Sequence, residues 1–493
     1  MNLPPSSAGS DPVKYGRNQG ARVPPYQRPL RPLEWAVLLH VGGMLTFATW
    51  GFGSGAEWVR TGLAWWGGLG ILLILTFVQG KENRAGAGLR PLRWLWPLVA
   101  FNLLTLAACL SPTFRTMHAG SEVMLVKIEM PAWRPSSALP AVAVYELWLF
   151  NALYLSAFNV ALVIRQRRAL RGLLVFAGIN ALALAVFGTL QKLAHAPGLF
   201  FGLVPSPQKF FFSSFVYHNH WGSFAVLMAA ASLGLAWHYA RRREDRDFLH
   251  SPACTWLVCV LAVAATVPLS GSRACSLLML ILLGGALLHT LVRMIRHRQR
   301  LRESIALPLA GALAAVVLAA GAIWFVARDS IELRVAKTKE QVSTMRAQGT
   351  VGTRAVLYRD TWAMARDKLW FGWGTGSYPH VFLLYNTIKP NSDRIPIYYA
   401  DAHSDWLQSV AEHGLVGTAL LGLCALVPLA GLRPRHFGSP FAAYLLAGCA
   451  LILLYAWVEF PFGNAAVVLS WWLVFFCAVR YARLESSAEG AVR

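Results

Sequence analysis

Long apolar blocks, separated by short polar segments, fill most of the chain. Each block is about 20 residues long, which is the length that a helix needs to cross a hydrocarbon core of about 30 Å. Only helices and closed barrels satisfy their own backbone hydrogen bonds in lipid, and barrel strands would alternate polar and apolar residues, which these blocks do not. We therefore predict an all-α integral membrane protein with about twelve transmembrane helices. The predicted spans are 33–53, 61–79, 93–111, 141–164, 171–190, 220–240, 252–270, 274–293, 305–327, 414–433, 440–459 and 463–482.

The charges are distributed unevenly between the two sides of this topology. The 493-residue chain is 56% hydrophobic and carries a formal net charge of +22, which by itself could indicate nucleic-acid binding. With the N-terminus inside, however, the inner segments hold 27 of the 45 Lys and Arg residues, the short outer loops hold 7, and the long loop 328–413 holds 11. This is the positive-inside bias, which predicts that both termini are cytoplasmic. We expect membrane lipids, and no nucleic acid, among the partners.

The apolar pattern divides the chain into five parts. Residues 1–32 form a basic, Pro-rich cytoplasmic tail that we expect to be disordered. Residues 33–327 hold spans one to nine, and 328–413 form a long loop on the outer side. Residues 414–482 hold spans ten to twelve, and 483–493 form a second cytoplasmic tail.

The long loop is predicted to fold, because it contains patterns of its own. Apolar residues recur at helical spacing over 351–370 and predict an amphipathic helix. A glycine-rich turn follows at 372–376, and a second short helix is predicted from near His403 to Gly414. The apolar face of the first helix is predicted to hold Ala355, Tyr358, Trp362, Ala365 and Leu369, with Arg359, Asp360, Arg366 and Asp367 on its other faces.

Two arginines on the predicted outer side are candidates for binding an anion. Arg273 lies in the tight turn between spans seven and eight, where an interfacial arginine can simply extend its charge into water. Alternatively, its guanidinium binds phosphate oxygens in a bidentate manner, with the Ser272 hydroxyl as a further donor. Arg354 begins the amphipathic helix, where the helix dipole favours anions. A solvated position is the alternative for Arg354.

His403 is the candidate for acid–base chemistry. An imidazole titrates near neutral pH and can take a proton from a hydroxyl group, although an isolated loop histidine is often merely solvated. Asp401 and Asp405 are close in sequence, and either could orient the ring. Two carboxylates with a histidine between them are also a weak metal signal, but we predict no metal and no cofactor.

Polar groups also occur inside or at the ends of the spans. His218, Asn219 and His220 open span six and either form a polar helix end or line an acceptor pocket. Glu146 and Asn151 lie within span four, where ionisable groups often indicate function. Hydrogen bonding between helices is the simpler interpretation of these two.

Four motifs, in this order and at this topology, resemble those of the superfamily of O-antigen ligases and O-antigen polymerases, which are polytopic membrane glycosyltransferases of a GT-C-like fold. The resemblance extends over roughly residues 210–435, and the long loop between spans nine and ten fits it. The motifs are Tyr217–Trp221, Ser270–Ala274, Thr353–Gly376 and His403–Gly417.

The resemblance implies a metal-independent transfer of a glycan from undecaprenyl diphosphate to a hydroxyl group of a lipid or glycan acceptor. The reaction would take place at the periplasmic face of the bacterial inner membrane. Carried over by motif, His403 resembles the general base, and Arg273 and Arg354 resemble the arginines that hold the diphosphate. The remaining candidates for the acceptor site or pocket are His218, Asn219, His220, Ser272, Asp401 and Asp405.

Several functions are compatible with the motifs. The one we favour is an O-antigen ligase, which joins a finished polysaccharide to lipid A–core or a similar acceptor. A polymerase of O-antigen or exopolysaccharide repeats and a protein O-oligosaccharyltransferase are the alternatives. A secondary transporter is a remote alternative, because the chain lacks the internal repeat and broken helices typical of that class.

Overall fold

The computed structural model describes residues 29–80, 87–241 except 121, 132 and 209, 250–306, 352–388 and 398–490, together with isolated positions between 309 and 343. Most of the predicted ninth span, 305–327, lies outside the described residues. The same holds for the first part of the loop 328–413 and for nearly all of the N-terminal tail.

In the part of the chain that the structure describes, eleven of the twelve predicted spans coincide with a helix. Nine helices there are long and apolar enough to cross a membrane, and two further apolar helices, α1 and α13, complete the set. The chain is therefore an all-α, multi-pass integral membrane protein. The helices are α1 (Pro32–Trp50), α2 (Glu57–Gln79), α3 (Trp96–Cys109), α4 (Pro140–Val163), α5 (Arg167–Leu193), α6 (His218–Arg241), α7 (Pro252–Ser270), α8 (Arg273–Leu301), α12 (Asp405–Leu429), α13 (Pro440–Tyr455) and α14 (Ala465–Gly490).

Helices α14 and α6 form the centre of the bundle. In the most apolar stretch of α14, 94% of the residues are buried inside the protein, and in that of α6 the share is 78%. The corresponding share is only 28% in α2 and α8, whose side chains mostly face outward. Small residues allow α6 and α13 to approach closely: a Cβ added to Gly448 would lie 2.5 Å from Cβ of Ala230. Close backbone packing of this kind is how helices associate in lipid, where burial of apolar surface supplies little drive.

Polar residues within the bundle pair between helices. Asn102 of α3 and Asn151 of α4 exchange two amide hydrogen bonds, of 3.0 and 2.6 Å. Glu146 of α4 accepts two hydrogen bonds from Nη2 of Arg60 in α2, of 2.6 and 2.7 Å. The prediction that Glu146 and Asn151 hydrogen bond between helices is confirmed.

The loop folds around α10 (Thr353–Asp367), which confirms the predicted amphipathic helix. Its buried face was predicted about one position out of phase. Leu357, Thr361 and Met364 are buried together with Ala365, whereas Trp362 is exposed. Asp360, predicted on a polar face, is buried because its Oδ2 accepts hydrogen bonds from the backbone and hydroxyl of Thr387.

The glycine-rich turn crosses the first part of α12 with almost no space between the two backbones. A Cβ added to Gly372 would lie 2.3 Å from the carbonyl of Glu412, and one added to Gly414 would lie 2.3 Å from the carbonyl of Trp370. Both glycines have positive φ (70° and 66°), which other residues rarely adopt. We call this contact the glycine crossing. Its backbone hydrogen bonds, 2.8–3.1 Å long, run from Trp373 N–H to Ala411 O, Gly374 N–H to Glu412 O, Leu415 N–H to Leu369 O and Val416 N–H to Trp370 O.

The predicted short helix before span ten is confirmed. Helix α12 begins at Asp405, and the non-helical Gly414 (φ 66°, ψ −175°) forms a kink that separates the short helix from the span. Helix α14 continues past the predicted end of span twelve, 482, to Gly490.

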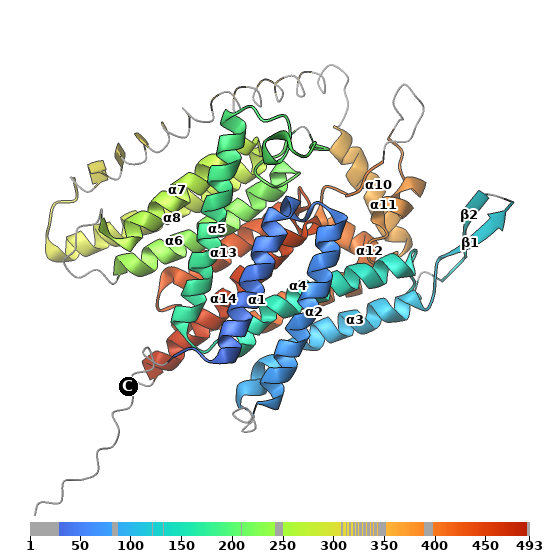
Figure 1. Ribbon diagram of the computed structural model, residues 1–493, viewed down its shortest axis with the longest axis horizontal. Coiled ribbons are helices and arrows are strands. Elements are labelled where there is room, and N and C mark those ends of the chain that lie inside the picture. Colours follow the sequence, from blue (N-terminus) through green and yellow to red (C-terminus); the bar gives the residue numbers. More distant parts are fainter. Residues whose placement is uncertain are drawn as a thin grey trace, which may run out of the picture.

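A short β-hairpin, which the sequence did not predict, lies in the segment before α4. Strands β1 (Phe114–Ala119) and β2 (Glu122–Lys127) pair antiparallel, with Phe114 opposite Lys127. The hairpin projects away from the helices at the end of the bundle where α10 and the short helix α11 (Tyr378–Val381) lie (Figure 1). Here α10, α11, the loop 456–464 and the N-terminal ends of α6, α8 and α12 together form what we call the site face.

Candidate functional site

His403 occupies the turn that leads into α12 and is held there by its backbone. It has φ of +52°, in the left-handed region, and its carbonyl accepts a 2.8 Å hydrogen bond from the hydroxyl of Tyr358 in α10. Ser404 is the N-cap of α12, and its side chain accepts from the amide of Leu407. The ring is therefore placed by two elements, and 27% of its side chain stays exposed.

Glu459, in the loop between α13 and α14, joins the predicted residues into one cluster. Its side chain is buried, with 4% exposed. Oε1 lies 2.6 Å from Nδ1 of His403, and Oε2 accepts hydrogen bonds from Nη2 of Arg354 (2.9 Å) and Nδ2 of Asn219 (2.7 Å). One carboxylate thus contacts side chains from the His403 turn, α10 and α6.

The charges of this cluster support an ionised Glu459. Burial by itself raises the pKa of a carboxyl group, but the hydrogen bond from His403 and the charge of Arg354 outweigh it, so the pKa of Glu459 lies below its ordinary value. For Arg354, burial acts against the charged form, but the Glu459 carboxylate raises the pKa of the guanidinium overall. We infer that this buried carboxylate is compensated by its partners.

Arg354 retains hydrogen-bonding capacity toward solvent. Nη1 donates to the carbonyl of Val458 (3.1 Å) and Nη2 to Glu459, which uses two of the five N–H donors of a guanidinium. Its side chain is 52% exposed. The group is anchored on one edge and can bind an anion with the other.

Asn219 connects the cluster to Arg273. Its Oδ1 accepts a 2.6 Å hydrogen bond from the hydroxyl of Ser272, while its Nδ2 donates to Glu459 and to the hydroxyl of Tyr217 (2.8 Å). Ser272 is the N-cap of α8, and Arg273 is the exposed first residue of that helix. The structure thus brings Asn219 and Ser272 together with His403 and Arg354, and it places Arg273 directly beside them in the chain.

An aromatic wall, formed around Phe460, flanks the histidine. The Phe460 ring stacks on Tyr217 (centroids 5.3 Å apart, planes 14° apart) and meets the rings of His220 and His403 edge-on at 5.2 and 4.9 Å. His220 Nε2 also lies 3.3 Å from the carbonyl of Phe460. His220 therefore contributes to this wall rather than to the carboxylate cluster.

The other predicted residues lie around the cluster. The Asp405 carboxylate accepts from the amide of Phe462 (2.8 Å), so it fixes the loop that carries Glu459. Asp401 lies close enough for the charges of His403 and Glu459 to act on it, and burial raises the pKa of its carboxyl to about 6. His218 packs its ring against Phe210 and Tyr217. The carboxylate on the ring nitrogen of His403 belongs to Glu459, not to Asp401 or Asp405.

Glu459 is the functional candidate that sequence reasoning missed. It is the last residue of the predicted span 440–459, at the end of an apolar block. An available signal was an acidic residue within Trp457–Phe462, an otherwise apolar stretch on the predicted outer side. Its partners lie 56 and 105 residues away along the chain, so the contact follows only from the fold.

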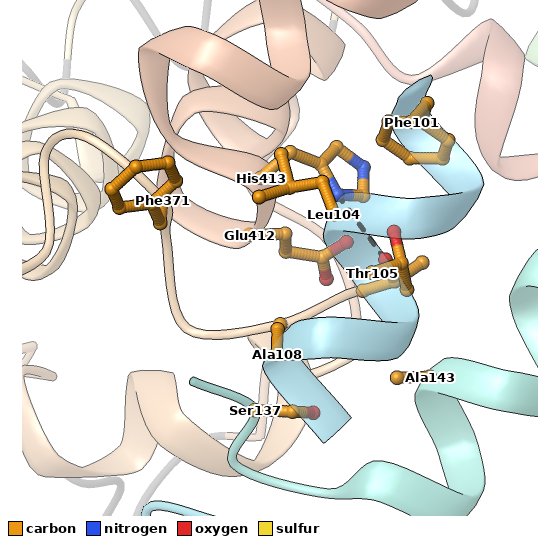
Figure 2. A pocket seen from close by; sticks show the side chains of 11 residues that line it. Phe101, Leu104, Thr105, Ala108, Ser137, Ala143, Phe371, Glu412 and His413 are labelled. Atoms are coloured by element: carbon orange, nitrogen blue, oxygen red, sulfur yellow. Dashed lines mark hydrogen bonds between the residues drawn. The ribbon is translucent and has the colours of Figure 1, made fainter. Parts of the chain in front are cut away.

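The pocket under the glycine crossing is too small for a substrate. Glu412 and His413 of α12 face α3, which contributes Phe101, Leu104 and Thr105 (Figure 2). The volume of this pocket is about 10 Å³, which is close to the smallest volume that holds one water molecule. The Glu412 carboxylate instead accepts hydrogen bonds from the amides of Gly376 and Tyr378, and it fixes the turn.

Within the described ranges, no group of three or more His, Cys, Asp and Glu side chains is placed to hold a metal ion. The prediction that no metal takes part stays a prediction. The arrangement can otherwise provide a base, at His403, next to a guanidinium that can bind an anion.

Comparison with known proteins addresses the same region. Residues 257–422 match the family model for O-antigen ligase, a range that contains Arg273, Arg354 and His403 but neither Asn219 nor Glu459. No curated protein matches the chain. This part of the chain, set among membrane-spanning helices, is therefore similar to the O-antigen ligase family and supports the resemblance found in the motifs.

Proposed function

We propose that the chain is a glycosyltransferase of the O-antigen ligase type, which transfers a glycan from undecaprenyl diphosphate to an acceptor hydroxyl. The observation that carries this proposal is the buried Glu459 carboxylate, which holds a histidine on one oxygen and an arginine on the other. A base and an anion-binding group in fixed relation are what a displacement at an anomeric carbon requires.

His403 acts as the general base in this proposal. When its Nδ1–H donates to Glu459, the lone pair lies on Nε2, the nitrogen that can accept a proton. Nε2 takes the proton of the acceptor hydroxyl while the oxygen forms the new bond to the anomeric carbon. The ionised Glu459 stabilises the imidazolium that results, as a carboxylate does in other histidine-based sites.

Arg354 and Arg273 bind the leaving group. The bond between the anomeric carbon and the diphosphate oxygen breaks, and its electron pair leaves with undecaprenyl diphosphate. Guanidinium groups bind phosphate oxygens in a bidentate manner and keep their charge at any working pH. They therefore stabilise the charge that develops on the diphosphate, without a step that needs a metal ion.

We place the site face on the periplasmic side of the bacterial inner membrane and both termini in the cytoplasm. The basic residues support this orientation. Helix α8 has Arg273 alone at the site face, whereas its last three turns contain Arg293, Arg296, Arg298 and Arg300. The C-terminal ends of α6 and α14 carry Arg241 and Arg480 in the same way. An excess of cations at the end away from the site indicates the cytoplasmic side.

The proposal is tested by deleting the gene in the native host and analysing undecaprenyl-linked glycans. A ligase predicts that long polymer accumulates on the lipid carrier and that His403→Ala, present in the membrane at the wild-type level, fails to complement. Accumulation of single repeat units would identify a polymerase instead. An unchanged glycan pool would contradict both and would direct attention to a protein acceptor.

A further inference from the structure

A second polar pocket lies next to the histidine cluster, between the beginnings of α2 and α4. Its volume is about 480 Å³, which is within the range of small-ligand sites. It is lined by the charged residues Glu57, Arg60 and Glu146 and by the aromatic Tyr145. Gly55, Ala141 and Val142 complete the lining.

Two close approaches and one electrostatic interaction place this pocket near the proposed reaction centre. A Cβ added to Gly55 would touch Val216, the residue before Tyr217. On the other side, the glycine-rich turn reaches the pocket, since a Cβ added to Gly376 would lie 3.0 Å from Cγ of Glu146. The charge of Arg60 also acts on Asp401, two residues before His403. A molecule in the pocket would thus lie close to the base.

The charges in this pocket differ from those of the anion site. The pocket is lined by two carboxylates, Glu57 and Glu146, and one guanidinium, Arg60, so it carries an excess of negative charge and disfavours phosphate. Carboxylate oxygens accept hydrogen bonds from the hydroxyl groups of a sugar, and an arginine donates to its ring or hydroxyl oxygens. The chemistry therefore fits a neutral sugar.

The Arg60–Glu146 pair is accessible enough to exchange partners. The two side chains are 32% and 25% exposed, and both hydrogen bonds that Glu146 accepts from Arg60 come from one guanidinium nitrogen. Arg60 also lies within 5.9 Å of the Tyr145 ring, whose hydroxyl is 3.2 Å from that of Thr61. Small-ligand sites combine aromatic side chains with a few placed hydrogen-bonding groups, and this combination suits the apolar face and the hydroxyl groups of a pyranose ring.

We propose that this pocket, formed by Glu57, Arg60, Tyr145 and Glu146, is a subsite for a neutral pyranose of the donor or acceptor glycan. The inference rests on the proposed function for its place in the reaction, but its binding chemistry can be measured separately. A purely structural brace between α2 and α4 is the competing explanation of the pair.

Exchanging the two charges separates these explanations. In the double variant Arg60→Glu with Glu146→Arg, the ion pair can re-form, so a brace would be restored together with the thermal unfolding temperature. A sugar subsite would not be restored, because donors and acceptors have changed places. The control is the same exchange at Arg167 and Glu485, an ion pair of α5 and α14 away from the site face.

Two measurements on the protein in lipid nanodiscs test the subsite. Saturation-transfer NMR with methyl glycosides of glucose, galactose, mannose and rhamnose reports binding without turnover. We expect a signal for at least one sugar that falls at least fivefold in the exchanged variant and not in the control. In transfer assays we expect KM to rise at least tenfold for the donor or for the acceptor, and the affected substrate identifies the source of the sugar.

Either of two results would overturn the subsite. One is that no methyl glycoside binds wild-type protein; the other is that the exchanged variant keeps wild-type binding and both KM values. Sugar binding without any glycan transfer by the wild-type protein would retain the subsite and count against the proposed function instead.

Discussion

Glu459→Gln is the substitution that tests the site most directly. The side chain keeps its size, but an amide has one acceptor oxygen and one donor group where the carboxylate has two acceptors. Because His403, Arg354 and Asn219 all approach Glu459, the new NH₂ group must face at least one of them. If the NH₂ group faces His403, it donates to Nδ1, and the ring then adopts the tautomer with its proton on Nε2. In that tautomer Nε2 can no longer accept a proton, so the ring cannot act as the base. If the NH₂ group faces Arg354, the charge-assisted bond is lost.

The expected loss follows from these contacts. A hydrogen bond to a charged group contributes about 1.5–3 kcal/mol, and the substitution also removes the charge that stabilises the imidazolium. We expect the transition state to be destabilised by about 2.7–4 kcal/mol, which corresponds to a fall in kcat of about 10²–10³-fold. The thermal unfolding temperature should fall only modestly, because the side-chain volume is unchanged.

The assay is transfer of a lipid-linked glycan to its acceptor by purified protein in nanodiscs. The matched control is Glu34→Gln: Glu34 is also buried and accepts backbone hydrogen bonds from Arg31 and Arg165, but it lies at the other end of the bundle. That variant should keep its kcat. If Glu459→Gln were within threefold of the wild-type rate, Glu459 would not be the group that positions the base.

Four further predictions follow from the same structure. Arg273→Lys should lower kcat/KM for the donor at least tenfold, because an ammonium cannot form the bidentate contact; a wild-type value, as expected for the control Arg293→Lys, would show that Arg273 only extends into water. Gly414→Ala should destabilise the protein by about 2–4 kcal/mol, through its positive φ and the contact with Trp370, whereas Gly422→Ala in the same helix, with open space around it, should not; equal unfolding temperatures of the two variants in detergent would refute the glycine crossing. The folded state raises the pKa of Asp401 from 3.8 to about 6, so ionisation of this carboxyl destabilises the fold as the pH rises through that range. The unfolding temperature of Asp401→Asn should therefore rise relative to that of the wild type between pH 4 and 6, and the difference should stay constant above pH 6. Parallel profiles of unfolding temperature against pH for the two proteins would count against this. Transfer should survive EDTA, and a loss restored by Mg²⁺ would make Asp401 and Asp405 candidates for metal ligands.

The sequence predicted the membrane architecture well, because spans are determined by local composition. Twenty apolar residues must become a helix in lipid whatever surrounds them. The amphipathic helix α10 was found for the same reason, but its phase was not, since Asp360 and Trp362 exchange their expected environments through contacts with distant segments. The hairpin β1–β2 was not predicted, although Gly120 and Ser121 in the sequence between its strands are a pair typical of a two-residue hairpin turn, because the segment between the two apolar blocks was interpreted only as a connection on the outer side.

The site was predicted in part. His403, Arg354, Asn219 and Ser272 come from separate motifs, and the structure joins them by hydrogen bonds. The group that joins them, Glu459, carries no motif and depends on how the loop 456–464 lies against α6 and α10. Sequence patterns identify residues with reactive side chains more readily than the residue that orients them, because orientation is a property of tertiary contacts.

The position of Glu459 has a consequence for how the protein is made. In a chain that emerges from the ribosome, α6, α8, α10 and the His403 turn come first, and the loop 456–464 and α14 follow later. Until then His403 has no carboxylate on Nδ1, and the central space that α14 fills is open. A chain that has not yet inserted α14 therefore has His403 and the arginines but not their alignment. Under the proposed function, insertion of α14 is the step that completes the site, so incomplete chains would not consume lipid-linked glycan.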